Sequence, residues 1–195
     1  MRRTTMLVVC SLALALCAGS AWAQTGAVTT PPADTLKVDY FANANTASAP
    51  DGTVRLTNPG TAPGNICANI FVFDVYQELS ECCSCFLSPD GLRTLSINTD
   101  LTKNPLTGVT LNTGVIKVVS TTLTAGTCPL PTRINPIAAV RTWVTHIQNG
   151  SFAETETGSV DATLSVGEVT RLAAQCSAIA LDGSGAGVCS CGSGD

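Results

Sequence analysis

The placement of the cysteines constrains this chain more than any other feature of its sequence. Of the ten cysteines, Cys10 and Cys17 lie in an apolar N-terminal stretch and eight follow it. Five of the eight are concentrated in Cys82-Cys83-Ser84-Cys85 and in Cys189-Ser190-Cys191 near the C-terminus. In an oxidising compartment such clusters cross-link distant segments, so they indicate how the chain is stabilised without naming an activity.

The N-terminus has the three parts of a secretory signal peptide. Basic residues precede an apolar run from Met6 to Cys17, and Ala21-Trp22-Ala23 offers small residues for cleavage before Gln24. The run is too short to span a membrane, and no later stretch reaches the roughly 18 apolar residues that a span needs. We expect residues 1–23 to be removed near Ala23 and the rest to be secreted or held at the cell surface, without spanning the membrane.

Loss of the signal peptide makes the chain more acidic. The net charge changes from −4 to −6 because Arg2 and Arg3 leave with residues 1–23. Nucleic acids and anionic membranes bind basic surfaces, so we expect neither as a partner. The remaining 172 residues suit one domain with an ordinary hydrophobic core, which disulfides would reinforce.

Alternation of apolar and polar residues, interrupted by turn signals, predicts a chain made mainly of β-strands. Residues 24–41 form an extended arm that ends in the alternating strand Leu36–Tyr40, and residues 42–195 form a single β-rich domain. Ala68–Tyr76 is apolar at both parities, which predicts a central strand covered on both faces. Other strands are expected at residues 54–56, 83–87, 92–97, 115–120, 140–148 and 151–157.

Two turn sequences predict hairpins. Ser88-Pro89-Asp90-Gly91 has the residues of a β-turn, so we expect it to pair residues 83–87 with 92–97. Asn149-Gly150 favours a two-residue type I′ turn between the next two strands. The resulting register places Ile147 opposite Phe152, His146 opposite Ala153, Thr145 opposite Glu154 and Trp143 opposite Glu156. Arg141 is then diagonal to Glu156, within reach for a cross-strand ion pair.

One helix and a small-residue tail complete the fold. Ser165-Val166-Gly167-Glu168 is a capping box, and Val169, Leu172, Ala173, Cys176 and Ile179 follow as one apolar stripe. The tail from Gly183 to Asp195 has no residues that can form a core, so disulfides must hold it. These features predict an antiparallel β-sandwich of immunoglobulin-like architecture, with one C-terminal α-helix and a disulfide-anchored, glycine-rich tail.

The cysteines are expected to form disulfides between the two ends of the domain. Neighbouring strand residues point to opposite faces, so Cys82 and Cys83 need different partners. We expect the mid-chain set of cysteines to pair with the C-terminal set, and Cys67 to pair with Cys128. The mid-chain set is Cys82, Cys83 and Cys85, and the C-terminal set is Cys176, Cys189 and Cys191. Each bond closes a long loop, for which chain-entropy models give about 4 kcal/mol.

The clustered thiols also raise the alternatives of a metal site or a redox-active pair. Several thiolates suffice for zinc, copper(I) or an iron–sulfur cluster. The usual C-x₂-C spacing is absent, and an exported chain meets oxidising conditions. We therefore expect disulfides, with no metal and no cofactor.

No set of residues forms a recognisable catalytic motif, and we assign no catalytic residue. His146 is the only histidine and lacks a nucleophile motif nearby, so a partly exposed strand histidine is the simpler interpretation. Asp74 lies within the apolar central strand, where a buried carboxylate can be functional, but a hydrogen-bonded or strand-end aspartate is the commoner outcome. Glu154 and Glu156 share one side of a strand, as a pair of carboxylates for glycoside cleavage would. Alternating Glu and Thr is, however, ordinary on a solvent-facing strand.

Three functions follow, in order of preference. The first is a secreted or cell-surface structural or adhesive protein, non-catalytic, that self-assembles when residues 24–41 add a strand to a neighbour's sheet. Pairing of that strand within its own sheet is the simpler alternative. The second is a secreted module that binds a ligand or an extracellular glycan through Trp143, Glu154 and Glu156, unless Trp143 belongs to the core. The third is a secreted hydrolase that uses Glu154 and Glu156.

Overall fold

The computed structural model describes residues 34–148 and 152–192. The expected cleavage site, the first part of the arm (residues 24–33) and the Asn149-Gly150 turn lie outside the described residues.

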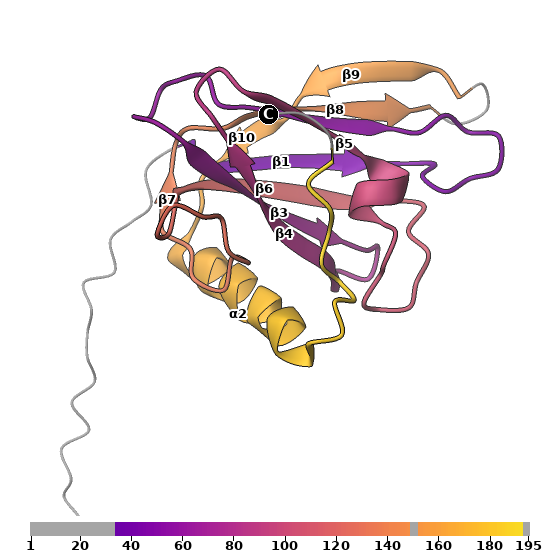
Figure 1. The fold of residues 1–195 in the computed structure, drawn as a ribbon. Helices are drawn as coiled ribbons and strands as arrows, with labels where there is room; N and C mark the ends of the chain where they lie inside the picture. Colours follow the sequence, from indigo (N-terminus) through magenta and orange to yellow (C-terminus); the bar gives the residue numbers. More distant parts are fainter. Residues whose placement is uncertain (1–33, 149–151, 193–195) are drawn as a thin grey trace, which may run out of the picture.

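The described chain is mainly β, with two antiparallel sheets and one C-terminal helix in three layers (Figure 1). The larger sheet has the order β10-β1-β6-β3-β4, and β7 pairs with the end of β6. Its strands are β1 (Leu36–Phe41), β3 (Ile66–Phe73), β4 (Leu79–Leu87), β6 (Gly114–Thr122), β7 (Pro136–Ile137) and β10 (Val160–Ala162).

The smaller sheet has the order β5-β2-β8-β9. Its strands are β2 (Thr53–Thr57), β5 (Leu92–Ser96), β8 (Arg141–Ile147) and β9 (Glu154–Gly158). A π-helical turn, Ile97–Leu101, follows β5, and the helix α2 is Val166–Asp182. Within the described ranges no helix is both long and apolar enough to cross a membrane.

The larger sheet is covered on both faces, as its apolar central strand predicts. All eight residues of β3 are buried, which confirms the expectation of a covered central strand. The expected C-terminal end is wrong, because β3 ends at Phe73, and Val75 and Tyr76 lie beyond it with 60% and 72% exposure. On one face Ile70 joins a core cluster with Val54 and Val144 of the smaller sheet. On the other face Phe71 packs in a second cluster with Leu172 of α2. Both clusters remove apolar area from water, the main stabilising contribution to the fold.

Helix α2 begins and ends where its sequence signals predict. The Ser165 hydroxyl accepts a hydrogen bond from the Glu168 backbone N–H at 3.1 Å, which satisfies one of the free donors of the first turn. Gly183 closes the helix in the left-handed conformation, with φ of 67°. The buried residues Leu172, Cys176 and Ile179 confirm the apolar stripe.

The turn Ser88–Gly91 forms, but the hairpin expected from it is wrong. The Gly91 N–H donates to the Ser88 carbonyl at 2.9 Å, yet β4 and β5 lie in different sheets. The reason is the contact of the turn with Asn58, whose carbonyl accepts from the Asp90 N–H at 2.9 Å. This contact holds the turn at the end of β2, so β5 pairs with β2 instead of β4.

The β8–β9 hairpin exists, but its register differs by two residues from the prediction. Thr145 lies opposite Glu156, His146 opposite Thr155 and Trp143 opposite Gly158. The Trp143 indole therefore lies over a residue without a side chain, where an added Cβ would be 3.7 Å from Nε1. A shift of two keeps every side chain on its expected face.

The ion pair expected from Arg141 is also wrong, as a consequence of this register. Arg141 pairs with Asp34 at 3.3 Å. Glu156 instead pairs with Arg55 of β2. The cation beside Glu156 therefore comes from the neighbouring strand β2 and not from β8 of the hairpin.

Four disulfides connect the segments that the sequence predicts they connect. Cys67 pairs with Cys128, and the first cluster pairs with the C-terminal set as Cys82–Cys176, Cys83–Cys189 and Cys85–Cys191. Cys82 lies in the cluster beneath α2, whereas Cys83 and Cys85 lie in the cluster between the sheets. The alternation of strand faces is thus the reason why adjacent cysteines bond to different segments.

The C-terminal tail covers one side of both sheets. Val188 forms a parallel bridge with Cys82, whose N–H donates to the Gly187 carbonyl at 2.8 Å. Further along, the Cys191 carbonyl accepts from Arg93 of β5 at 3.1 Å. In Figure 1 the tail runs upward from the end of α2 across this side. On another side of the sheets, β9 continues through Ser159 into β10, so one segment belongs to both sheets.

Candidate functional site

A cavity of about 690 Å³ lies where β9 passes into β10. Its wall is largely apolar and includes Val38, Tyr40, Val115, Val160 and Ala162. Tyr40 is 52% exposed and Val160 is 70% exposed, so apolar surface extends to the rim. The cavity lies beside the segment that leaves the smaller sheet after Gly158 and enters the larger sheet at Val160.

His146 is the main polar group inside this cavity, and the structure buries it to 6% exposure. Its Nε2 lies 2.7 Å from Thr157 Oγ1 and 3.4 Å from Asp39 Oδ1. The Tyr40 ring lies against the imidazole, with centroids 4.4 Å apart. Nδ1 has no partner among the described residues, which favours the tautomer that carries its proton on Nε2. Because His146 is buried, the interpretation from the sequence of a partly exposed strand histidine is wrong.

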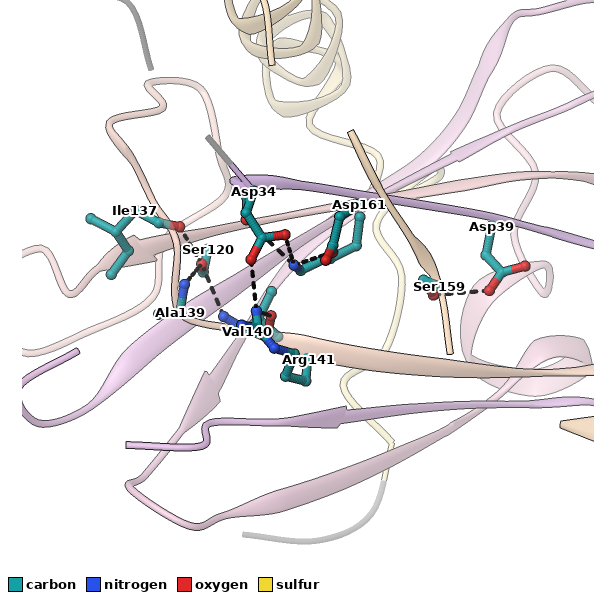
Figure 2. A network of polar contacts seen from close by, with 10 residues as sticks. Asp34, Asp39, Ser120, Ile137, Ala139, Val140, Arg141, Ser159 and Asp161 are labelled. Atoms are coloured by element: carbon teal, nitrogen blue, oxygen red, sulfur yellow. Dashed lines mark hydrogen bonds and ion pairs between the residues drawn. The ribbon is translucent and has the colours of Figure 1, made fainter. Parts of the chain in front are cut away.

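Asp39 completes the polar side of the cavity. Its side chain is 8% exposed. Oδ2 accepts from the Ser159 hydroxyl at 2.9 Å (Figure 2), and Oδ1 accepts from the Tyr40 N–H at 2.9 Å. The carboxylate thus ties β1 to the residue between β9 and β10.

The geometry around His146 does not match a nucleophilic triad. In a triad, one ring nitrogen takes the proton of the nucleophile and the other is held by a carboxylate. Here Asp39 and Thr157 are both closest to Nε2. An Nε2–H that donates to Thr157 cannot remove a proton from it, so the arrangement supplies no general base for acyl transfer through Thr157.

A network of charged residues closes the cavity side of the molecule. Lys37 is only 2% exposed and contacts the carboxylates of Asp34, at 2.6 Å, and Asp161. Lys37, together with a hydrogen bond to Asp161, lowers the pKa of Asp34. Arg141 adds a contact to Asp34 at 3.3 Å (Figure 2). These contacts connect β1, β8 and β10.

A second set of hydrogen bonds in Figure 2 fixes the segment that leads into β8. The buried Ser120 hydroxyl of β6 donates to the Ile137 carbonyl at 2.6 Å. The same oxygen accepts from the N–H groups of Ala139, at 3.2 Å, and Val140, at 3.3 Å. This segment thereby sets where β8 starts.

The binding residues expected from the sequence lie on the opposite face of the same hairpin. Trp143 is 39% exposed, and Glu154 and Glu156 share its face of β8 and β9. None of the three lines the His146 cavity. Arg55 neutralises Glu156, which gives no support to the hydrolase hypothesis. A role in binding for these residues stays a prediction.

The cysteine cluster has the spacing of a metal site but not its chemistry. Sγ atoms of Cys83, Cys85 and Cys191 lie within 4.8 Å of one another. Each belongs to a disulfide. A metal centre requires thiolates, and a disulfide has none. In this oxidation state the cluster stabilises the fold.

Sequence reasoning missed the cavity residues Asp39 and Tyr40, and also Ser159, which donates a hydrogen bond to Asp39. The alternation of Leu36–Tyr40 predicts a strand, and its polar residues were expected to face solvent. In the structure Lys37 and Asp39 are buried because β10 and β8 lie beside this part of β1. The one signal in the sequence for these residues is that Lys37 and Asp39, which carry opposite charges, lie two residues apart and therefore on the same face of the strand.

Comparison of the chain with protein-family models, with curated proteins and with solved structures gave no match in any of the three.

Proposed function

We propose that this chain is an exported, non-catalytic domain that binds a small and largely apolar ligand in the His146 cavity. The observation that carries the proposal is an apolar cavity of about 690 Å³ with few polar groups. Ligand sites in proteins span roughly 300–1,000 Å³ and combine apolar walls with a few placed polar groups. The order of preference from the sequence thus changes, because the cavity favours binding over assembly.

The polar groups of the cavity suit orientation of a ligand. His146 and Asp39 are held by neighbouring side chains, so they keep their positions without a ligand. Gln148 and Thr155 line the cavity and are exposed, so they can exchange hydrogen bonds with a ligand at the rim. Preorganised groups of this kind lower the entropic cost of binding.

The proposal includes export and a place outside the cell. The four disulfides support it, because such bonds persist in oxidising compartments. Cleavage of residues 1–23 would place Gln24 at the N-terminus. N-terminal sequencing of the secreted protein tests this, and a mature chain that begins at Met1 contradicts it.

We also propose that the two sheets form an immunoglobulin-like sandwich. The support is the core cluster that contains Val54 of β2, Ile70 of β3 and Val144 of β8, which come from both sheets. Connections that cross between the sheets, as from β2 to β3 and from β4 to β5, are consistent with this arrangement.

Binding of indole to the oxidised mature chain tests the ligand proposal. Indole has an aromatic ring for the apolar wall and one N–H for the polar rim. We expect saturable chemical-shift changes in NMR spectra at Tyr40, His146 and Val160. Val160→Trp, at an exposed wall position, fills the cavity and should abolish them.

Leu181→Trp is the matched control, since it adds the same side chain at a helix position that is 86% exposed. It should leave indole binding unchanged. Indole that does not bind, or binds equally to the Val160→Trp variant, would exclude this cavity as the site.

Self-assembly through residues 24–41 remains a second candidate function. In the structure β1 occupies its own sheet between β10 and β6. Assembly would therefore require exchange of β1 between copies, a known route to oligomers. Light scattering should then show polymers that increase with concentration and vanish when residues 24–41 are deleted. A strictly monomeric full-length mature chain would refute this function.

A further inference from the structure

A second cavity, of about 480 Å³, adjoins the first across Val115, which contributes to the walls of both. It lies at the end of β3, beside β6 and α2, and its wall includes Phe73, Asp74, Lys117 and Arg171. The first cavity is largely apolar, whereas the second carries charges of both signs. The pair therefore resembles the two halves of a site for an amphipathic molecule.

The two cations of the second cavity are fixed in place. Glu168 accepts from Lys117 at 2.7 Å and from Arg171 at 2.7 and 2.9 Å. These partners, Arg171 foremost, lower the pKa of Glu168 to about 2, so it is ionised at neutral pH. Lys117 and Arg171 also lie 5.3 and 5.0 Å from the centroid of the Phe73 ring, in cation–π contact. Two cations share one carboxylate, which leaves positive charge for an anionic group.

Asp74 supplies negative charge to the second cavity, which suits a cationic group of a ligand. It is 3% exposed. Its Oδ1 accepts from the N–H groups of Tyr76 and Glu78, both at 2.9 Å. Oδ2 is buried and has no partner among the described residues. An unpaired buried carboxylate oxygen is costly, so a ligand donor at this atom would recover free energy.

We propose that the second cavity binds the zwitterionic head group of a free α-amino acid with an apolar side chain. The ammonium group donates to Asp74 Oδ2, the carboxylate accepts from Lys117, and the side chain passes Val115 into the His146 cavity. An anion alone would leave Asp74 unpaired, and a cation alone would leave the positive charge unused. This inference rests on the proposed function, because the His146 cavity takes the apolar part.

Calorimetric titration of the oxidised mature chain with three matched probes at neutral pH tests the inference. The probes are phenylalanine, 3-phenylpropionate, which lacks the ammonium, and phenethylamine, which lacks the carboxylate. We expect phenylalanine to bind at least tenfold more tightly than either analogue. Asp74→Asn, which keeps an oxygen for Tyr76 and Glu78, should abolish the preference over 3-phenylpropionate. Lys117→Met, which keeps the alkyl chain, should abolish the preference over phenethylamine.

Asp90→Asn and Lys103→Met are the matched controls, because both residues are exposed and lie outside the two cavities. They should leave all three affinities unchanged. If indole binds but phenylalanine binds no better than the analogues, the head-group site is wrong and the apolar site stands. If phenylalanine binds and neither cavity variant changes the preference, the assignment to Asp74 and Lys117 is overturned. If neither indole nor phenylalanine binds, both proposals fail.

Discussion

One side of the two sheets is closed by covalent bonds, and another is closed by polar contacts around a cavity. On the first, Cys83–Cys189 and Cys85–Cys191 hold the tail along β4. On the second, β9 continues into β10, and residues 154–162 contain no cysteine. Lys37, Asp161 and the hydrogen bond from Ser159 to Asp39 hold that segment.

On this comparison the tail side contributes stability, and the cavity side serves the proposed ligand binding. Disulfides act largely by restricting the unfolded chain. Apart from Val188, which packs against the cluster beneath α2, the apolar contacts of the tail with the core come from its cysteines. The β9–β10 segment must leave room between its neighbours, since the cavity is there. Polar contacts fix it while the wall remains open to a ligand. The comparison predicts that damage to the tail side reduces stability and that damage to the cavity side reduces binding.

Loss of the tail disulfides is the largest expected effect. The variant Cys83→Ala/Cys189→Ala removes a bond with a sequence separation of 106 residues. We expect the free energy of unfolding in urea to fall by about 2–5 kcal/mol. Indole affinity at a temperature where the variant is folded should stay within about twofold of the unaltered chain. An equal loss of stability and of affinity would contradict the separation of the two sides.

Lys37→Met is expected to have an intermediate effect, on the cavity side. Lys37 is buried, whereas Asp34 and Asp161 are partly exposed, so their charges remain hydrated after the substitution. We expect a loss of about 2 kcal/mol, below the cost of breaking a fully buried pair. Hydrogen exchange should increase in β10 and β1 and not in the tail. Exchange that increases equally in both regions would show that the two sides are one cooperative unit.

Glu81→Gln is expected to have the smallest effect and the opposite sign, on the tail side. Glu81 of β4 is 1% exposed and accepts from the Asn104 N–H at 3.0 Å, while the Asn104 carbonyl accepts from Gly187 of the tail. Burial raises the pKa of Glu81 from 4.5 to about 7. The folded chain therefore keeps a proton that the unfolded chain loses, and this contribution to stability falls as pH rises from about 4.5 through 7.

Glutamine keeps the oxygen for Asn104 and cannot ionise. We expect Glu81→Gln to raise the free energy of unfolding by about 1–2 kcal/mol at pH 8 and to leave it unchanged at pH 4. Glu78→Gln, at an exposed position nearby, is the control and should show no such dependence. A stabilisation that is the same at both pH values would rule out ionisation of Glu81 as its cause.

Much of the local structure follows from short-range patterns in the sequence. The uniform apolar character of β3 predicts its burial, and Ser165 and Gly183 mark the ends of α2. The pairing of the two cysteine sets also follows, because adjacent residues of a strand face opposite sides, but the individual partners within the sets come only from the structure. The partner of each strand does not follow from such short-range patterns. The turn at Ser88–Gly91 forms as its sequence predicts, but it joins strands of different sheets because Asn58 binds it.

The candidate site shows the same limit more strongly. The sequence directs attention to Trp143, Glu154 and Glu156, which lie on the outer face of the β8–β9 hairpin. The cavity lies elsewhere and combines Asp39 of β1 with His146 of β8 and Thr157 of β9. His146 and Thr157 share the β8–β9 hairpin, which a local turn signal predicts, but Asp39 is distant in the chain and no local pattern brings it to them.

The sequence by itself determined the strand-rich character, the helix with its caps and which two sets of cysteines meet, because these depend on periodicity and on nearest neighbours. Only the tertiary structure decided the register of the β8–β9 hairpin, the burial of Lys37 and Asp39 and the position of the cavity. Those features depend on which distant surfaces exclude water from one another. The cysteine clusters therefore identify how the tail side of the two sheets is held. The proposed site lies on the face of the β8–β9 hairpin opposite to Trp143.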